Sequence, residues 1–508
     1  MAKIERTKNA SRNIYFGVIL QIYKLIIPFV MRTALIYLMG MEYVGLNSLF
    51  ISVLQVLNLA ELGVGSAMVY SMYKPIVEDD TVTICALMKL YRLYYRMIGL
   101  FIAVVGAIAT PFSPKLIRGN VPGDLNIYIL YLLNLGATVL SYWLFAYKNS
   151  ILLAHQRTDI ISKITLVTNS LQYIAQIILL WLFRNYYLFV ITALITQAVT
   201  NIVTACFSNK MYPMFYPEGN LPKDEVKRIN QRIKDLFSAK LGTVLGISVD
   251  SIVISAFLGL TSFAVYQNYC YILNAVVGFF LIFFNSTRAG IGNSLIVEKP
   301  EKNYNDFKKM AFIVLWLTTI AISCFMTLYQ PFMAIWAGEG YLLPFYMVIL
   351  FCLYFFLIIM QELSFAFKDA AGIWHEDRFR PLIAGVVNLL LNILLVRRWG
   401  LPGILLSTII SYLFIATPWV IHNLFKLVFK RSPTEYIKQI AVGLFLAFLT
   451  GFASYKICSY VMLKGFLGLF VNFLISFFIS NAILLVVYRK TDLFRQMIIL
   501  SKRMIRKI

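Results

Sequence analysis

The sequence predicts an all-α polytopic membrane protein. Apolar runs of about 20 residues, the length that crosses a bilayer core as a helix, recur along nearly all of the 508 residues. Hydrophobic residues make up 60% of the chain and charged residues only 14%, a balance that excludes an ordinary soluble protein. The alternating pattern of outer-membrane barrel strands is absent. We therefore expect 14 transmembrane helices.

The expected spans follow one another with short connections. They cover residues 14–38, 44–72, 83–112, 125–147, 160–183, 187–209, 236–260, 264–290, 307–330, 341–367, 379–396, 402–425, 436–457 and 466–488. The basic residues before the first span are typical of a signal peptide, but that apolar run is too long and lacks a cleavage site, so we expect an uncleaved helix. The basic and apolar tail, 489–508, is expected to lie on the inner membrane surface.

The net charge of +23 is explained by topology rather than by nucleic-acid binding. About 37 of the 46 Lys and Arg residues fall at the termini and the even-numbered connections, which the positive-inside rule assigns to the cytoplasm. Both termini are therefore expected in the cytoplasm, with anionic membrane lipids as the partner of the basic side. The six scattered cysteines and three histidines indicate no disulfide framework and no metal site. No ATP-binding or hydrolase motif occurs, so we expect neither an enzyme nor a cofactor.

Three pairs of segments recur in the same order and predict an internal duplication. FAYKNSILLAH at 145–155 matches FAFKDAAGIWH at 365–375, and ELGVGSA at 61–67 resembles RAGIGNS at 288–294. Gly40 corresponds to Gly259 in the same way. Because each repeat holds six spans, an even number, we expect two six-helix lobes related by a pseudo-two-fold axis along the membrane normal. The expected domains are a first lobe at 1–209, a cytoplasmic linker at 210–235, a second lobe at 236–430, and two further helices with a basic tail at 431–508.

The first span carries two cations, Lys24 and Arg32, on either side of Pro28. A charge inside a membrane span costs at least about 2.5 kcal/mol, so such residues are expected to face a wet or protected interior. Lys24 and Arg32 lie within roughly 80° of each other around the helix and would form a cationic wall for an anionic headgroup. The alternative is that Lys24 extends to the interface and Arg32 anchors the outer end.

The second span carries a polar stripe at helical spacing, formed by Gln55, Asn58, Glu61 and Gly65. Glu61 is a candidate proton or cation site, or a counter-ion for the cations of the first span. The alternative is a charge that pairs with a neighbouring helix for packing. Asp250, in the middle of the seventh span, is a second candidate for ion coupling.

The repeat places unlike charges at corresponding positions of the two lobes. The repeat brings Arg32 near Asp250 in register, and Glu61 corresponds to Arg288. We expect these unlike charges to pair across the lobes when one mouth of the cleft closes. Arg288 is also a candidate for contact with an anionic substrate.

Two lysines, Lys148 and Lys368, occupy equivalent positions at the cytoplasmic ends of the fourth and tenth spans. They are candidates for holding a diphosphate as point charges at the inner mouth. They are equally explained as ordinary positive-inside anchors. Gln361 and Glu362, about two turns deeper in the tenth span, are weaker candidates for the polar path.

The stretch from Arg32 to Ile76, with VDSIVISAFLG at 249–259 and NSTRAGIGN at 285–293, resembles the bacterial polysaccharide-transporter flippases. These belong to the multidrug/oligosaccharidyl-lipid/polysaccharide (MOP) superfamily. The resemblance implies two lobes that alternate access in a bacterial cytoplasmic membrane. It implies movement of undecaprenyl-diphosphate-linked oligosaccharide to the outer leaflet for surface or capsular polysaccharide biosynthesis. A proton or sodium gradient would drive the cycle, and the cations would hold the headgroup.

Other functions remain open at this point. The multidrug exporters of the same superfamily are the first alternative, although an exporter of cations would be expected to have mainly acidic residues in its spans. A membrane polymerase or ligase of lipid-linked sugars would need a large outer loop, which is absent from the expected topology. A channel or scaffold and a peptidoglycan-precursor flippase are further alternatives. We expect a functional monomer that works beside a polysaccharide polymerase and glycosyltransferases.

Overall fold

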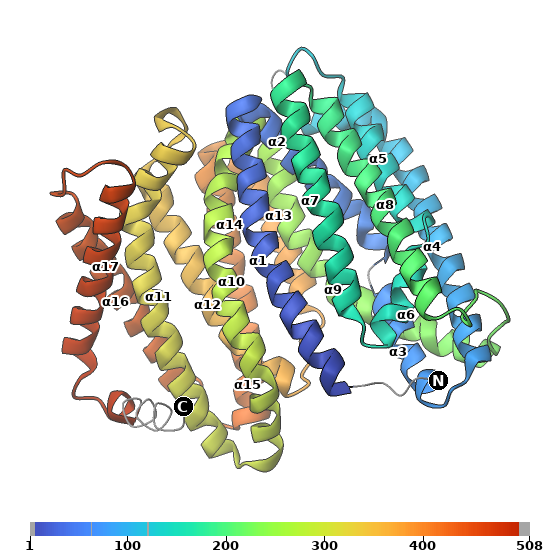
Figure 1. The fold of residues 1–508 in the computed structure, drawn as a ribbon. Coiled ribbons are helices and arrows are strands. Elements are labelled where there is room, and N and C mark those ends of the chain that lie inside the picture. Colours follow the sequence, from blue (N-terminus) through green and yellow to red (C-terminus); the bar gives the residue numbers. More distant parts are fainter. Residues whose placement is uncertain (1–5, 62, 119–120, 497–508) are drawn as a thin grey trace. The chain divides into compact units, whose positions relative to one another are not determined.

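The computed structural model describes residues 6–61, 63–118 and 121–496, and every regular element in these ranges is a helix (Figure 1). The chain packs as two compact units, Met1–Ala264 and Val265–Ile508. The all-α membrane fold predicted from the sequence is confirmed. The predicted lobes and linker have boundaries that differ from those of the two compact units, and they stay a prediction.

Within the described residues, the first unit contains nine complete α-helices, interrupted by short 3-10 turns, and the first turn of α10. These are α1 (Arg6–Leu38), α2 (Met41–Leu57), η1 (Asn58–Glu61), α3 (Val64–Val77), α4 (Thr81–Ala109), η2 (Thr110–Leu116), α5 (Ile127–Trp143), η3 (Ala146–Lys148), α6 (Asn149–Ala154), α7 (Thr158–Phe183), α8 (Tyr186–Met211) and α9 (Lys223–Leu258). Helix α1 packs along α7, and α4 packs against both α3 and α5.

The second unit contains most of α10 and all later helices. These are α10 (Leu260–Val297), α11 (Pro300–Trp336), η4 (Glu339–Tyr341), α12 (Phe345–Ala370), α13 (Arg380–Trp399), α14 (Leu401–Ser411), η5 (Tyr412–Ala416), α15 (Thr417–Leu424), η6 (Phe425–Phe429), α16 (Thr434–Cys458) and α17 (Gly465–Tyr488). Helices α16 and α17 pack on α11 through small and hydroxyl side chains, and Ser323 bonds to Ser454 at 2.7 Å. Small residues of this kind allow close helix approach in membranes.

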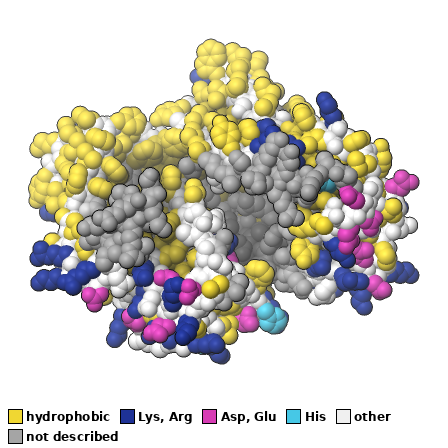
Figure 2. Space-filling view, turned by 60° about the horizontal axis from the view of Figure 1, so that its bottom comes forward, with side chains coloured by type: hydrophobic (Ala, Val, Ile, Leu, Met, Phe, Trp, Pro, Cys, Tyr) yellow, Lys and Arg dark blue, Asp and Glu magenta, His cyan; other side chains and the backbone are white. Residues whose placement is uncertain are grey.

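The described residues contain 11 stretches long and apolar enough to cross a membrane, or 12 if the bent pair Ile127–Trp143 and Ala146–Ala154 is one span. Each coincides with a span expected from the sequence, but because only 11 or 12 stretches qualify, the count of 14 is not confirmed. Two expected spans remain. The span 44–72 falls on the broken segment α2–η1–α3, in which α2 by itself is too short to cross a membrane, and the span 236–260 falls on α9. On the face shown in Figure 2, most charged side chains lie in the lower part of the view, whereas hydrophobic side chains gather in its upper part.

Two glycines at the predicted repeat positions have the same backbone conformation. Gly40, between α1 and α2, has φ 110° and ψ 171°, and Gly259, between α9 and α10, has φ 88° and ψ 172°. A side chain at such positive φ values is strained, so glycine is required at both turns. The matching turns agree with the internal duplication that the sequence predicts.

Helix α9 covers both the end of the predicted linker and the seventh expected span. It begins at Lys223 and continues without a break through the expected span 236–260 as far as Leu258. The irregular part before it packs against α4. Its contacts include a hydrogen bond from Lys89 Nζ to Asn220 Oδ1 at 3.0 Å. Of the predicted surface-lying tail, residues 497–508 lie outside the described residues.

Candidate functional site

The second span, predicted as a continuous helix, is broken in the structure. Helix α2 ends at Leu57, a 3-10 turn follows at Asn58–Glu61, and Gly63 adopts φ 92° before α3 begins. Asn58 and Glu61 therefore lie in the break rather than on the face of a regular helix. Irregular backbone at membrane depth is tolerated only where it is buried in protein or lines a wet cavity, and transporters build binding sites from such breaks.

Two tyrosines of α4 form a hydrogen-bonded chain that ends at Glu61. The hydroxyl of Tyr91 donates to the hydroxyl of Tyr95 at 2.6 Å, and Tyr95 donates to Glu61 Oε1 at 3.3 Å. Both tyrosines are buried, and their ring centroids lie 4.3 Å apart. A carboxylate that accepts from a buried phenol is held in a fixed orientation in a region with little water.

The last turn of α5 supplies a third tyrosine to this cluster. Tyr142 donates from its hydroxyl to Asn58 Oδ1 at 3.1 Å, and its ring lies 5.3 Å from that of Tyr95. Helix α5 itself breaks just beyond this point, where Phe145 has φ 58° and the chain bends by 46° into the next helical segment. Two broken spans are thus joined by one hydrogen bond between their polar side chains. We call Asn58, Glu61, Tyr91, Tyr95 and Tyr142 the Glu61 site.

Gly65 permits this close packing, rather than adding polarity to the stripe predicted from the sequence. A Cβ atom built on Gly65 would lie 3.0 Å from the hydroxyl of Tyr91 and 3.1 Å from Glu61 Oε1. Both distances are shorter than ordinary van der Waals contact, so a larger residue would push the hydrogen-bonded groups apart.

The Glu61 site offers a single carboxylate surrounded by amide and phenol oxygens. These are hard oxygen ligands, which suit a proton or a small hard cation better than a soft transition metal. Within the described residues, no group of three or more His, Cys, Asp or Glu side chains is placed to hold a metal ion. The arrangement can therefore bind a monovalent ion or accept a proton.

The two cations of the first span have different surroundings. Lys24 is exposed on α1, in the middle of the span Tyr15–Leu38. Arg32 is half-buried and donates to Ser48 Oγ at 3.3 Å and to the carbonyl of Ala264 at 3.2 Å. Arg32 thus ties α1 to α2 and to the first turn of α10, which favours a packing role beside the predicted substrate role.

Asp250 is half-buried on α9, and its neighbourhood joins α9 to α2. Ser248, two residues earlier, donates to Gln55 Oε1 at 3.3 Å. The role of Asp250 in ion coupling stays a prediction.

In the second unit, three cations and two carboxylates form a connected network. Asp377 accepts from Lys368 Nζ at 2.8 Å and from Arg380 Nε and Nη2 at 2.7 and 3.1 Å. Asp369 lies 3.2 Å from Lys368 Nζ and 3.4 Å from Arg288 Nη2. We call these five residues the α12 charge network, because they surround the end of α12.

The members of the α12 charge network differ in how available they are to a ligand. The side chain of Lys368 is 9% exposed and has two acidic partners, whereas that of Arg288 is 41% exposed and has one distant partner. An exposed ion pair of that kind contributes only about 0–1 kcal/mol, so an anionic ligand can replace Asp369 at Arg288 at little cost. Glu362, half-buried on α12, lies within electrostatic reach of Arg288 and Lys368.

Lys148, the counterpart of Lys368 in the first unit, is equally buried but has different partners. It is 6% exposed, against 7% for Lys368, and donates to the carbonyl of Phe215 at 3.2 Å. The hydroxyl of Ser208 donates to the carbonyl of Lys148 at 3.3 Å. These contacts favour the anchor interpretation of Lys148, and its proposed contact with a diphosphate stays a prediction.

Sequence reasoning missed the groups that complete both sites. Three are the tyrosines of the Glu61 site, and the others are the carboxylates and Arg380 of the α12 charge network. The pair Tyr91 and Tyr95 carried a signal, because hydroxyl-bearing rings four apart on an apolar span share one face. Asp377 and Arg380, three apart and next to the repeated segment 365–375, carried another.

No protein-family model and no curated protein matches the sequence. Among solved structures, the lipid II flippase MurJ in an inward closed conformation matches 94% of this chain and 99% of its own, with a TM-score of 0.62 at 16% identity. An inward-facing multidrug resistance MATE family transporter of the MOP superfamily matches 80% of this chain and 97% of its own, with a TM-score of 0.60 at 13% identity.

A MOP superfamily transporter from Pyrococcus furiosus matches 84% of this chain and 97% of its own, with a TM-score of 0.51 at 12% identity. These similar proteins are flippases and transporters rather than enzymes. At such low identities, the likeness establishes the fold. The chain therefore has the fold of the MOP-superfamily flippases and transporters, as the resemblance in its sequence predicted.

Proposed function

We propose that this protein is an ion-driven flippase that moves undecaprenyl-diphosphate-linked oligosaccharide from the inner to the outer leaflet of a bacterial cytoplasmic membrane. The observation that carries the proposal is Lys24, a lysine exposed in the middle of a span. A charge at that depth is costly in lipid, so its exposed position marks a wet path. A cationic wet path suits an amphiphile with an anionic head, because the lipid tail remains in the bilayer while the head crosses.

The Glu61 site would couple this movement to a proton or sodium gradient. Binding of either ion neutralises the carboxylate and weakens its attraction for cations elsewhere in the path. Both the tyrosine chain and the broken backbone belong to elements of one unit, so ion binding would change how α2, α4 and α5 pack. The predicted pairing of unlike charges, Arg32 with Asp250 and Glu61 with Arg288, would close one mouth of the path in turn.

Arg288 is the cation that we propose as the second contact for the diphosphate. Its guanidinium is more exposed and less firmly paired than the ammonium of Lys368. Arginine is also suited to bidentate contact with phosphate oxygens. Lys148 and Lys368 would act as secondary, long-range attraction for the headgroup at the cytoplasmic side.

The test is translocation of labelled undecaprenyl-diphosphate oligosaccharide in proteoliposomes, with and without an imposed proton or sodium gradient. We expect gradient-stimulated movement by the wild type and loss of movement in Lys24→Gln. Lys74→Gln is the matched control, because Lys74 is an exposed lysine at the end of α3 with a weak partner. Equal transport by Lys24→Gln and the wild type would contradict the proposed headgroup path.

Two other substrates are tested in the same vesicles. The likeness to the MATE family transporter favours a cation exporter as the second candidate, and efflux of cationic dyes without movement of any lipid-linked sugar would establish it. The likeness to the lipid II flippase makes the peptidoglycan precursor the nearest rival substrate, and a preference for lipid II over the oligosaccharide would assign it.

We propose a functional monomer that works beside a polymerase and glycosyltransferases and that binds anionic lipids on its basic side.

A further inference from the structure

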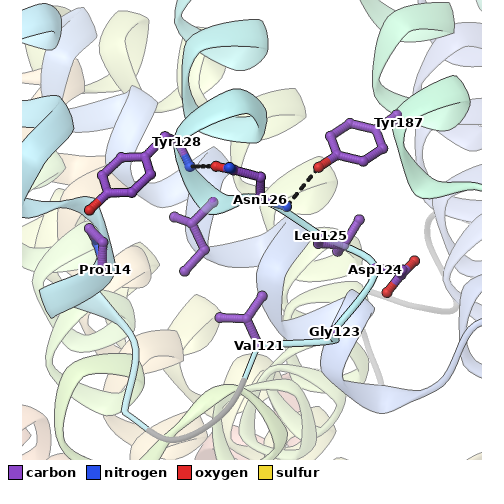
Figure 3. A pocket seen from close by; sticks show the side chains of 9 residues that line it. Pro114, Val121, Gly123, Asp124, Leu125, Asn126, Tyr128 and Tyr187 are labelled. Atoms are coloured by element: carbon purple, nitrogen blue, oxygen red, sulfur yellow. Dashed lines mark hydrogen bonds between the residues drawn. The ribbon is translucent and has the colours of Figure 1, made fainter.

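A pocket of about 500 Å³ opens at the end of the first unit where α5 and α8 begin (Figure 3). Its volume lies within the range of about 300–1,000 Å³ that is typical of small-molecule sites. The predicted topology places this end of the unit on the outer side of the membrane. We call it the outer pocket, and it is lined by Pro114, Val121, Gly123, Asp124, Leu125, Asn126, Ile127, Tyr128 and Tyr187.

Hydrogen bonds hold the loop that forms the outer pocket. The side chain of Asn126 caps α5 by accepting from the backbone N–H groups of Tyr128 and Ile129 at 2.9 and 3.3 Å. The backbone N–H of Asn126 donates to the hydroxyl of Tyr187 at 2.6 Å. Asp124 Oδ1 accepts from the hydroxyl of Tyr43 at 2.6 Å, which fixes the carboxylate to α2. These bonds hold in place the loop that lines the outer pocket.

These bonds leave several polar groups of the outer pocket available. Within the described part of the chain, Asp124 Oδ2, the side-chain N–H groups of Asn126 and the hydroxyl of Tyr128 have no hydrogen-bond partner. The rings of Tyr128 and Tyr187 lie on two sides of the pocket, with Asn126 between them (Figure 3). A carboxylate accepts hydrogen bonds, an amide donates them, and a phenol does both.

This combination matches the chemistry of a sugar ring. A pyranose has an apolar face of C–H groups, which stacks on an aromatic ring, and hydroxyls that both donate and accept at its edge. The lining contains one carboxylate and no Lys, Arg or His. An anionic group such as the lipid diphosphate would therefore be repelled by Asp124 and find no cation in the pocket.

We propose that the outer pocket binds a neutral sugar ring, with stacking on Tyr128 and Tyr187 and with hydroxyls bonded to Asp124 and Asn126. Sugar binding in itself does not depend on the proposed lipid-linked substrate. The further role, in which the pocket receives a sugar of the exported oligosaccharide on the outer side, rests on the proposed function.

Saturation-transfer NMR on the full-length protein in lipid nanodiscs tests the proposal. The probes are glucose, galactose, mannose, rhamnose and N-acetylglucosamine at high millimolar concentration, with tetramethylammonium as a cation probe. We expect at least one neutral sugar to receive magnetisation in the wild type. Asp124→Asn and Tyr128→Ala should each bind it about tenfold more weakly, because a hydrogen bond to a charged group or a stacking surface is lost.

Two further variants separate binding from general effects. Tyr128→Phe keeps the ring and should retain most of the binding, whereas Tyr346→Ala removes an exposed tyrosine from the start of α12 and should leave it unchanged. The proposal is overturned if no sugar of the panel receives magnetisation, or if Asp124→Asn and Tyr128→Ala bind as the wild type does. It is also overturned if tetramethylammonium binds at Asp124 and the sugars do not.

The same preparations, assayed for lipid-linked transport, distinguish this inference from the proposed function. If the protein binds a sugar in a way that depends on Tyr128 but moves no lipid-linked sugar, the outer pocket is confirmed as a sugar site and the proposed flippase function is refuted. Transport by Tyr128→Ala at the wild-type rate, together with lost sugar binding, would show a pocket that acts after translocation.

Discussion

Asp377→Asn tests whether the α12 charge network stabilises the second unit. The substitution keeps the shape of the side chain but removes the charge that faces Lys368 and Arg380. The side chains of Asp377, Lys368 and Arg380 are only 5%, 9% and 11% exposed. Removing one partner of a buried ion pair costs about 3–5 kcal/mol, because the other charge stays buried without compensation.

The expected magnitude lies at the lower end of that range. Lys368 keeps a second acidic partner, Asp369, at 3.2 Å, so we expect a loss of about 3 kcal/mol in the free energy of unfolding. For the second unit, Val265–Ile508, this corresponds to a drop of about 6–12 °C in melting temperature. The measurement is thermal unfolding of the purified protein in detergent, followed by intrinsic fluorescence.

Asp306→Asn is the matched control for this prediction. Asp306 pairs with Lys309 at 3.3 Å, but its side chain is 45% exposed, so its loss should cost less than about 1 kcal/mol. The double variant Lys368→Gln with Asp377→Asn should recover part of the loss, since Arg380 is then the one cation left without its bond to Asp377, instead of Lys368 and Arg380 together. Equal melting temperatures for Asp377→Asn and Asp306→Asn would refute the argument that burial makes this network stabilising.

Three further predictions concern the first unit. Glu61→Gln should abolish the stimulation of transport by an ion gradient while leaving the melting temperature within a few degrees of the wild type. Tyr95→Phe removes one donor to Glu61 and should only reduce the stimulation. Equal stimulation in the wild type and both variants would exclude the Glu61 site from coupling. Gly65→Val should destabilise the protein by about 1–3 kcal/mol through overpacking against the tyrosines, measured by thermal unfolding beside Gly136→Val, which faces open space. Burial lowers the pKa of His155 below its usual value, so below about pH 6.5 the unfolded chain binds a proton more readily and stability falls with falling pH; the slope of melting temperature between pH 7.5 and 5 should be smaller in His155→Phe.

The candidate sites show why side-chain partners were harder to predict than elements. Lys148 and Lys368 look equivalent in the sequence and are equally buried, yet one contacts a backbone carbonyl and the other two carboxylates. The difference arises because Asp369 and Asp377 have no acidic counterparts at the matching positions of the first repeat. Arg32 was predicted to face a wet or protected interior, and its acceptors are a serine and a carbonyl that only the packing of three helices brings together.

The sequence by itself determines the fold class of this protein, because the length and spacing of its apolar runs leave the backbone no alternative to membrane-spanning helices. It also places Glu61, Lys24 and Arg32 inside spans, where a charged side chain costs free energy and is therefore a candidate functional residue. Only the tertiary structure shows that the second span is broken at Glu61 and that tyrosines from α4 and α5 meet it there. A glycine-bearing segment allows both a continuous and a broken helix, and the choice depends on neighbours that satisfy the freed polar groups.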